Sequence, residues 1–300
     1  MRRALAWLLA SWLACAGAVA FAQTEPPVEL SGTLAKARAA GAVVLAYRES
    51  SIPFSYLSTR GEPIGYSIEL CRKLVEAIGE AVGRELAIEW VPVTSESRIE
   101  AIASGKADLE CGSTTANLER RKRVSFSPTI FVSGTKLMVK RGSKIKSFRD
   151  LSGRTVVVTA GTTNEQAMRD LAKKFNLDFR IVVARDHADS FAQVVQGKAD
   201  AFATDDVLLY GLIAQNQMGA TYDVIGEFLS YDPYGIMFRK GDAQLERVVN
   251  DAFHDLAEDG EVERQYKRWF MSRLPSGVTL GLPMSAQLES IVRSMAAKPE

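Results

Sequence analysis

The chain has 300 residues, of which 47% are hydrophobic and 24% charged, and its formal net charge is +1. A near-neutral chain lacks the basic surface that nucleic-acid binding requires, so we expect no nucleic-acid partner. The length predicts one large or two ordinary globular domains, each able to bury its own core.

The N-terminus has the pattern of a secretory signal peptide. Arg2 and Arg3 precede an apolar run over 4–22 that ends in small residues around Phe21, which is typical of a cleavage site after Ala22. An uncleaved membrane anchor and a lipid-modified Cys15 are the alternatives. Cleavage removes two of the 37 basic residues and none of the 36 acidic ones, so we expect an exported mature chain with a formal charge of −1.

Two cysteines, Cys71 and Cys111, remain after this processing. In an oxidising compartment such a pair often forms a disulfide, and two buried free thiols are the alternative, which the sequence leaves open. Neither cysteine has a His or Cys at metal-ligand spacing, so we expect no metal site.

Strand-like and helix-like patterns alternate in the first half of the mature chain. Strands are predicted over 43–46, 86–91 and 109–111, and helices over 67–78 and 97–103. The first of these helices has its apolar residues on one face. This alternation predicts an α/β fold with a largely parallel sheet.

The same alternation begins again downstream. Strands are predicted over 155–159, 179–183 and 201–204, and helices over 164–175 and 190–195. Two successive halves rich in βαβ units predict two lobes.

A short internal repeat points to a site between these lobes. The tetrapeptide Gly-Lys-Ala-Asp occurs at 105–108 and at 197–200, and each copy precedes a strand that ends at a polar residue, Ser113 or Asp205. Ligands of open α/β sheets bind beyond the carboxyl ends of the strands. Two matching strand ends therefore predict a ligand cleft between the lobes.

The segment after Gly226 is too short for a third lobe. It contains one predicted strand over 234–238 and a long predicted helix over 243–270. We expect it to return to the first lobe, which would leave the second lobe inserted, with chain crossings near 133–135 and 228–231. Two crossings predict a hinge.

Several stretches carry specific motifs in a specific order: YRESSIPFSY (47–56), GYSIEL (65–70), TSESRI (94–99), ECGSTTANLERRKRVSFS (110–127), TAGTTNE (159–165), ARDHADSF (184–191) and ATDDVLL (203–209). Together they resemble the periplasmic solute-binding proteins for polar amino acids, the bacterial extracellular solute-binding protein family 3. The glutamate/aspartate-binding branch is the most similar. The resemblance covers about residues 34–270.

This resemblance implies a two-lobed periplasmic-binding-protein fold of type II, in which helices flank a mainly parallel sheet in each lobe. It implies a periplasmic, monomeric, non-catalytic protein without a cofactor, whose partners are an acidic amino acid and an inner-membrane ABC permease. The expected division of the chain is a signal peptide (1–22), a discontinuous lobe 1 (23–133 and 231–272), lobe 2 (136–228) and a C-terminal extension (273–300).

The resemblance also assigns residues to the α-carboxylate of the ligand. Arg120 matches a family arginine that grips this group with a bidentate fork, which suits the planar guanidinium. By its neighbours alone, Arg120 would be a solvated helix residue in a run of basic side chains. Ser113 and Thr115 are expected to offer hydroxyl and backbone groups, and their alternative role is capping the next helix.

Two further residues, from the second half of the chain, complete the set expected to bind the α-carboxylate and the α-ammonium of the ligand. Thr163 follows a glycine-containing turn before a predicted helix, where backbone N–H groups favour an anion. Asp205 matches the family aspartate that pairs with the α-ammonium. Its rival is Asp206, for which a helix cap is the expected role.

A second set would recognise an acidic ligand side chain: Arg48, Ser95, Arg98 and His187. For the arginines the alternative is an ordinary surface ion pair. For His187 it is a helix cap or a hydrogen bond to a nearby aspartate. The other mature-chain histidine, His254, has no such motif, and we expect it to be structural.

Two other functions have to be considered. A binding protein for a neutral polar amino acid such as glutamine would not need the additional arginines. A dehydratase-type enzyme on the same fold would need a general acid or base that substrate binding leaves free. The motif residues are all assigned to the ligand, so the sequence favours a binding protein.

Overall fold

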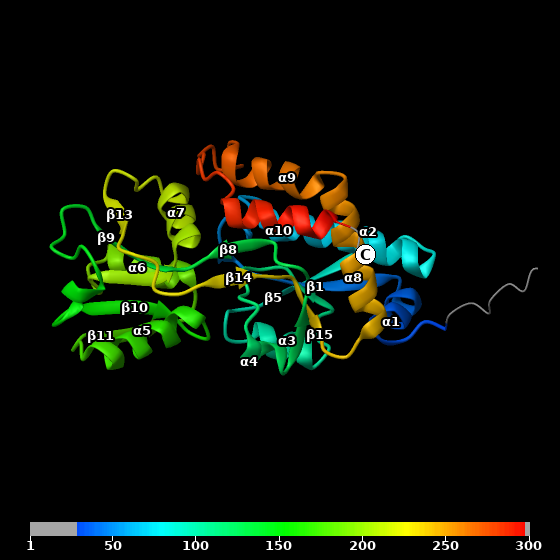
Figure 1. Ribbon diagram of the computed structural model, residues 1–300, viewed down its shortest axis with the longest axis horizontal. Helices are drawn as coiled ribbons and strands as arrows, with labels where there is room; N and C mark the ends of the chain where they lie inside the picture. The colour runs from blue at the N-terminus through cyan, green and yellow to red at the C-terminus, as the bar shows by residue number, and fades with distance from the viewer. Residues whose placement is uncertain (1–28, 298–300) are drawn as a thin grey trace, which may run out of the picture.

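The computed structural model describes residues 29–297. The predicted signal peptide therefore lies outside the described residues. Figure 1 shows two α/β bodies side by side, joined by extended segments near β8 and β14. This two-lobed arrangement confirms the predicted fold class.

The sheet of the first lobe has the strand order β5-β1-β6-β15-β7. Strands β5 (Ala87–Pro92), β1 (Ala42–Tyr47) and β6 (Leu109–Glu110) are parallel. Strand β15 (Met237–Arg239) returns from the far end of the chain and pairs antiparallel with both β6 and β7 (Val124–Phe126). The last part of the chain therefore completes the first sheet.

The main helix of this lobe, α2 (Tyr66–Val82), follows the predicted amphipathic pattern. Its large apolar residues are buried, and its C-terminal cap is Gly83, whose φ of 72° is a left-handed conformation that glycine adopts without strain. The remaining elements of this part of the lobe are shorter: α1 (Gly32–Ala40), β2 (Ser50–Ser51), β3 (Ser55–Leu57), β4 (Pro63–Ile64), α3 (Arg98–Ala103) and α4 (Leu118–Arg121).

The sheet of the second lobe has the order β11-β10-β12-β9-β13. Strands β11 (Arg180–Ala184), β10 (Thr155–Thr159) and β12 (Ala201–Asp205) are parallel, whereas β9 (Thr135–Lys140) is antiparallel to both of its neighbours, β12 and β13 (Tyr222–Ile225). The helical elements of this lobe are η1 (Phe148–Leu151), α5 (Thr163–Phe175), α6 (His187–Val195) and α7 (Asp206–Gln215).

Two antiparallel strands, β8 (Phe131–Ser133) and β14 (Asp232–Tyr234), carry the chain between the lobes. The single strand predicted over 234–238 is wrong. Strand β14 pairs with β8, whereas β15 pairs in the first sheet, and Gly235 and Ile236 separate them. Alternation along a sequence cannot reveal that a strand changes partners.

The long helix predicted over 243–270 is also wrong. It is divided into α8 (Ala243–Glu258), α9 (Glu261–Tyr266) and a π-helical turn (Lys267–Met271). Between the first two, Gly260 has a φ of 69°, which is outside the helical region.

The described part of the C-terminal extension folds back on the first lobe. Helix α10 (Ala286–Ala296) packs on α8, and its Leu288 and Val292 are buried in the core. His254 is structural: its Nδ1 lies 3.0 Å from the Met295 carbonyl oxygen. At the other end of α10, Gln287 Nε2 donates to Tyr231 Oη at 2.8 Å.

A disulfide joins Cys71 on α2 to Cys111, which directly follows β6. The two Cα atoms are 6.1 Å apart and 40 residues separate the cysteines in sequence. The bridge therefore ties the main helix of lobe 1 to the segment that enters the cleft.

We predict that the double variant Cys71→Ala/Cys111→Ala lowers the free energy of unfolding by about 4 kcal/mol, because it releases a chain loop of this length in the unfolded state. Urea unfolding of oxidised, reduced and variant protein measures the difference, and reduced wild type should match the variant. Two freely alkylatable thiols in unfolded, unreduced protein would contradict the bridge.

Candidate functional site

A small cavity lies between the lobes at the carboxyl ends of their parallel strands. It has about 200 Å³ of empty volume. Segments after β6 and around α3 line it from lobe 1, and the ends of β10 and β12 line it from lobe 2. The lining residues are Arg98, Ser113, Thr115, Thr162, Thr163, Asn164, His187, Asp205 and Leu208.

Six of the nine predicted ligand residues are in that lining set. The other three, Arg48, Ser95 and Arg120, are buried without lining the cavity. Thr163 is half-buried, and the remaining eight predicted residues are buried.

Two buried arginines of lobe 1 have N–H groups without a hydrogen-bond acceptor among the described residues. Arg48 is only 1% exposed, and no described residue accepts a hydrogen bond from its Nη1 or Nη2, nor from Nε of Arg98. Burial, followed by repulsion from Arg98, lowers the pKa of Arg48 to about 9. Burial also lowers the pKa of Arg98. Both guanidinium groups stay charged at neutral pH, and an unsatisfied buried cation favours an anionic ligand.

Arg120 spans the two lobes. Its Nη1 donates to the Thr115 carbonyl oxygen at 2.9 Å, and its Nη2 donates to the Gly161 carbonyl oxygen at 3.3 Å. Burial, followed by repulsion from Arg98, lowers the pKa of Arg120 to about 9. With 8% exposure it is not a solvated helix residue, unlike its neighbour Leu118 at 84%.

The cap of helix α4 is Asn117, which accepts from the Arg120 backbone N–H at 2.9 Å. Ser113 and Thr115 therefore do not perform the capping role that was their alternative. The hydroxyl oxygen of Ser113 has no hydrogen-bond partner among the described residues.

His187 begins helix α6, and Asp186 is the cap of that helix. Its Nδ1 lies 2.9 Å from Thr159 Oγ1 rather than bonding a nearby aspartate. Burial, followed by the charges of Arg48 and Arg98, lowers the pKa of His187 well below its ordinary value. The imidazole is therefore neutral at physiological pH and adds no charge to the cleft.

Asp205 ends β12 and is held by one group from lobe 2 and one from the crossing strand β14. Asn164 Nδ2 donates to its Oδ1 at 2.7 Å, and the Tyr234 hydroxyl donates to its Oδ2. Burial, followed by the charge of Asp232, raises the pKa of Asp205 to about 7. Its rival Asp206 accepts instead from Ser133 Oγ at 2.7 Å.

The lobes touch around the cavity. Thr115 Oγ1 and Thr163 Oγ1 are 3.3 Å apart, and they donate to Asp232 Oδ1 at 3.0 and 2.8 Å respectively. Gly161 of lobe 2 lies against lobe 1, since a β-carbon on it would be 2.7 Å from Glu96 Cα. These contacts describe a closed cleft.

Sequence reasoning missed four residues that surround the predicted ones. The sequence offered a signal for two of them, because Asn164 and Glu110 lie inside the motifs TAGTTNE and ECGSTT. The other two, Asp232 and Tyr234, come from the returning strand β14. Only the three-dimensional pairing brings them to the cleft.

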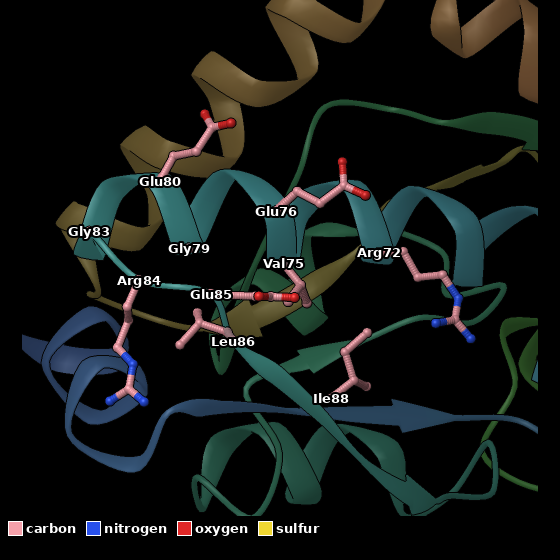
Figure 2. Close-up of a pocket in the computed structure, with 10 residues that line it drawn as sticks. All are labelled: Arg72, Val75, Glu76, Gly79, Glu80, Gly83, Arg84, Glu85, Leu86 and Ile88. Carbon is pink, nitrogen blue, oxygen red and sulfur yellow. The ribbon is translucent and has the colours of Figure 1, made fainter.

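A larger hollow lies elsewhere, between α2 and β5, with about 1050 Å³ of empty volume. Figure 2 shows Leu86 and Ile88 beneath the helix, while Glu76 and Glu80 point away from them. Arg84 Nη1 already donates to the Arg38 carbonyl oxygen at 2.9 Å. This hollow lacks the convergent buried charges of the cleft.

The sequence profile described as "Bacterial extracellular solute-binding proteins, family 3" matches residues 43–272. The chain belongs to this family. Among described residues, no helix combines the length and the apolar character needed to cross a membrane.

Curated relatives match along most of the chain. The L-glutamate/L-aspartate-binding protein of Pseudomonas aeruginosa is 43% identical over 273 residues, which is 90% of each chain. The glutamate/aspartate import solute-binding protein of Escherichia coli is 36% identical over 284 residues, 94% of each.

A solved relative supports the fold. The structure titled "An ancestral arginine-binding protein bound to arginine" aligns with a TM-score of 0.70 at 30% identity, covering 77% of this chain and 98% of that one.

Proposed function

We propose that this family 3 protein is the periplasmic substrate-binding component of an ABC transporter and captures L-glutamate or L-aspartate in the interlobe cleft. One observation carries the proposal: two arginines beyond Arg120 are buried beside the cavity with unpartnered donors. An amino acid whose only carboxylate is the α-carboxylate would leave them uncompensated. The glutamate/aspartate relatives support the same ligand class.

In this proposal the α-groups of the ligand bind where the lobes meet. Arg120 and the Ser113 hydroxyl would hold the α-carboxylate. The hydroxyls of Thr115 and Thr163 would turn from Asp232 to the same group. The carboxylate of Asp205 would pair with the α-ammonium, which replaces the proton favoured there by burial. The α-carboxylate and the α-ammonium then both have buried partners of opposite charge.

The acidic side chain would be held mainly from lobe 1, by Arg48, Ser95 and Arg98. Ser95 Oγ has no partner among the described residues, so it can donate to a carboxylate. His187 is neutral and bonded through Nδ1. Its Nε2 remains for a ligand contact, and its tautomer follows from what that contact requires.

A neutral amino acid such as glutamine is the second candidate ligand, and the charge of the cleft disfavours it. The permease partner, the monomeric state, the cleaved signal peptide and the domain boundaries given above belong to the same proposal. The similar curated proteins are named as binding proteins, which favours transport over catalysis.

We predict that glutamate and aspartate bind the purified mature protein at least 100-fold more tightly than glutamine or asparagine, because an amide cannot neutralise the two side-chain arginines; such a factor is about 2.7 kcal/mol. Calorimetry against the common amino acids measures the affinities. Tighter binding of glutamine than glutamate would contradict the acidic assignment.

We predict that Arg120→Ala abolishes measurable binding of every amino acid, whereas Arg98→Ala weakens glutamate much more than glutamine. Breaking a buried charge pair costs about 3–5 kcal/mol, while losing one neutral hydrogen bond costs about 1 kcal/mol. Calorimetry of both variants with both ligands is the measurement. Arg121→Ala, on the same short helix, is the matched control, since Arg121 is exposed. Equal losses for both ligands in Arg98→Ala would make Arg98 a scaffold residue.

We predict that glutamate binding weakens as the pH falls below about 7, by up to tenfold per pH unit. Asp205 has a pKa of about 7 in the closed cleft. Pairing with the ammonium requires the ionised form of Asp205, so binding below that pH releases a proton. Calorimetry in buffers of different ionisation enthalpy counts this proton. Asp205→Asn should bind weakly and without the pH dependence. A pH-independent wild type between pH 5 and 8 would refute the assignment.

A further inference from the structure

Glu110 is a buried acid directly behind the cleft. It ends β6, is 0% exposed, and precedes the segment that carries Ser113 into the cavity. Thr114 Oγ1 donates to its Oε2 at 2.6 Å, but Oε1 has no hydrogen-bond partner among the described residues. A buried carboxylate that is only half satisfied by hydrogen bonds needs an electrostatic reason to remain there.

Gly112 places this carboxylate beside Arg48. A β-carbon on Gly112 would lie 2.2 Å from Glu110 Oε1 and 3.0 Å from Arg48 Cγ. The carboxylate and the arginine stem therefore flank the same glycine, although no hydrogen bond joins them. The absence of a side chain at Gly112 is what allows both groups to occupy this place.

The charge of Glu110 acts on the whole arginine set. It favours the protonated forms of Arg48, Arg98 and Arg120, raising the pKa of each against the lowering by burial. Asp205, by comparison, acts in this way on Arg98 and Arg120. Glu110 is thus a counter-charge for Arg120, which is proposed to bind the α-carboxylate, and also for Arg48 and Arg98, which are proposed to bind the ligand side chain.

We propose that Glu110 is a specificity-determining residue that limits how strongly the cleft prefers a side-chain carboxylate to an amide. Its negative charge offsets part of the free-energy cost of burying the arginines when no ligand is bound. It also repels the side-chain carboxylate of a bound ligand through the low-dielectric interior. The role rests on the proposed function, since it concerns the same arginines.

The nearby Asp108 provides the contrast. It is also a buried acid, but its oxygens are satisfied by Lys36 Nζ at 2.8 Å and by the Val44 backbone N–H at 2.9 Å. It precedes β6, at the end of the strand opposite to Glu110. Asp108 therefore supplies a matched control, a buried carboxylate of the same segment with a purely structural role.

The test compares Glu110→Gln with Asp108→Asn by calorimetry with glutamate and glutamine. The Glu110→Gln side chain keeps the shape of the original, and its amide oxygen can still accept a hydrogen bond from Thr114, so the variant removes the charge alone. We expect the ratio of the glutamine Kd to the glutamate Kd to rise about tenfold in Glu110→Gln, because a repelling charge is gone. In Asp108→Asn the melting temperature should fall while this ratio stays unchanged.

Two outcomes would overturn the proposal. An unchanged ratio in Glu110→Gln would make Glu110 structural, like Asp108. A lower ratio would mean that Glu110 orients the arginines toward the ligand instead of opposing its charge. A wild type that does not prefer glutamate would contradict the proposed function, whereas the change in the ratio is measured separately and tests Glu110 in either case.

A second variant keeps the proposal testable if Glu110→Gln does not fold. Arg48→Gln/Glu110→Gln removes one charge of each sign from the same place. The counter-charge role predicts that this double variant folds even where Glu110→Gln does not, because one uncompensated arginine is gone. A double variant that likewise fails to fold would refute the role.

Discussion

The burial of three guanidinium groups around one cavity is the constraint on which the site depends. Removing such charges from water costs several kcal/mol each, and the lowered pKa values of Arg48 and Arg120 express that cost. The surrounding groups respond to it. Glu110 and Asp205 supply negative charge, whereas His187 stays neutral because a further cation beside the arginines would be unfavourable.

The topology brings these charges together. In both lobes the parallel strands point their carboxyl ends at the interface, so β6 of lobe 1 and β12 of lobe 2 each end on a cleft carboxylate. The crossing strands β8 and β14 lie beside them and add Asp232 and Tyr234 to the cleft. Figure 1 shows these strands between the lobes. The crossing strands therefore contribute side chains to the site as well as connecting the two bodies.

Sequence patterns predicted the two-lobed fold well because the local spacing of apolar residues indicates which face of a helix or strand is buried. They failed where the outcome depends on distant partners. The strand predicted over 234–238 changes sheets at Gly235, and the helix over 243–270 breaks at Gly260. In the site, the types of residue came from the resemblance, but their partners did not. The bond of His187 to Thr159 is set by packing between elements.

Selectivity in such a cleft follows from charge balance. With all acids ionised, the arginines Arg48, Arg98 and Arg120 face the carboxylates Glu110, Asp205 and Asp232. A neutral amino acid adds one charge of each sign, so it gives the side-chain arginines nothing beyond hydrogen bonds. An acidic amino acid adds one uncompensated negative charge beside them. The ammonium of such a ligand takes the place of the proton that burial favours on Asp205, whose pKa is about 7. Its additional carboxylate meets the guanidinium N–H groups of Arg48 and Arg98 that have no partner among the described residues.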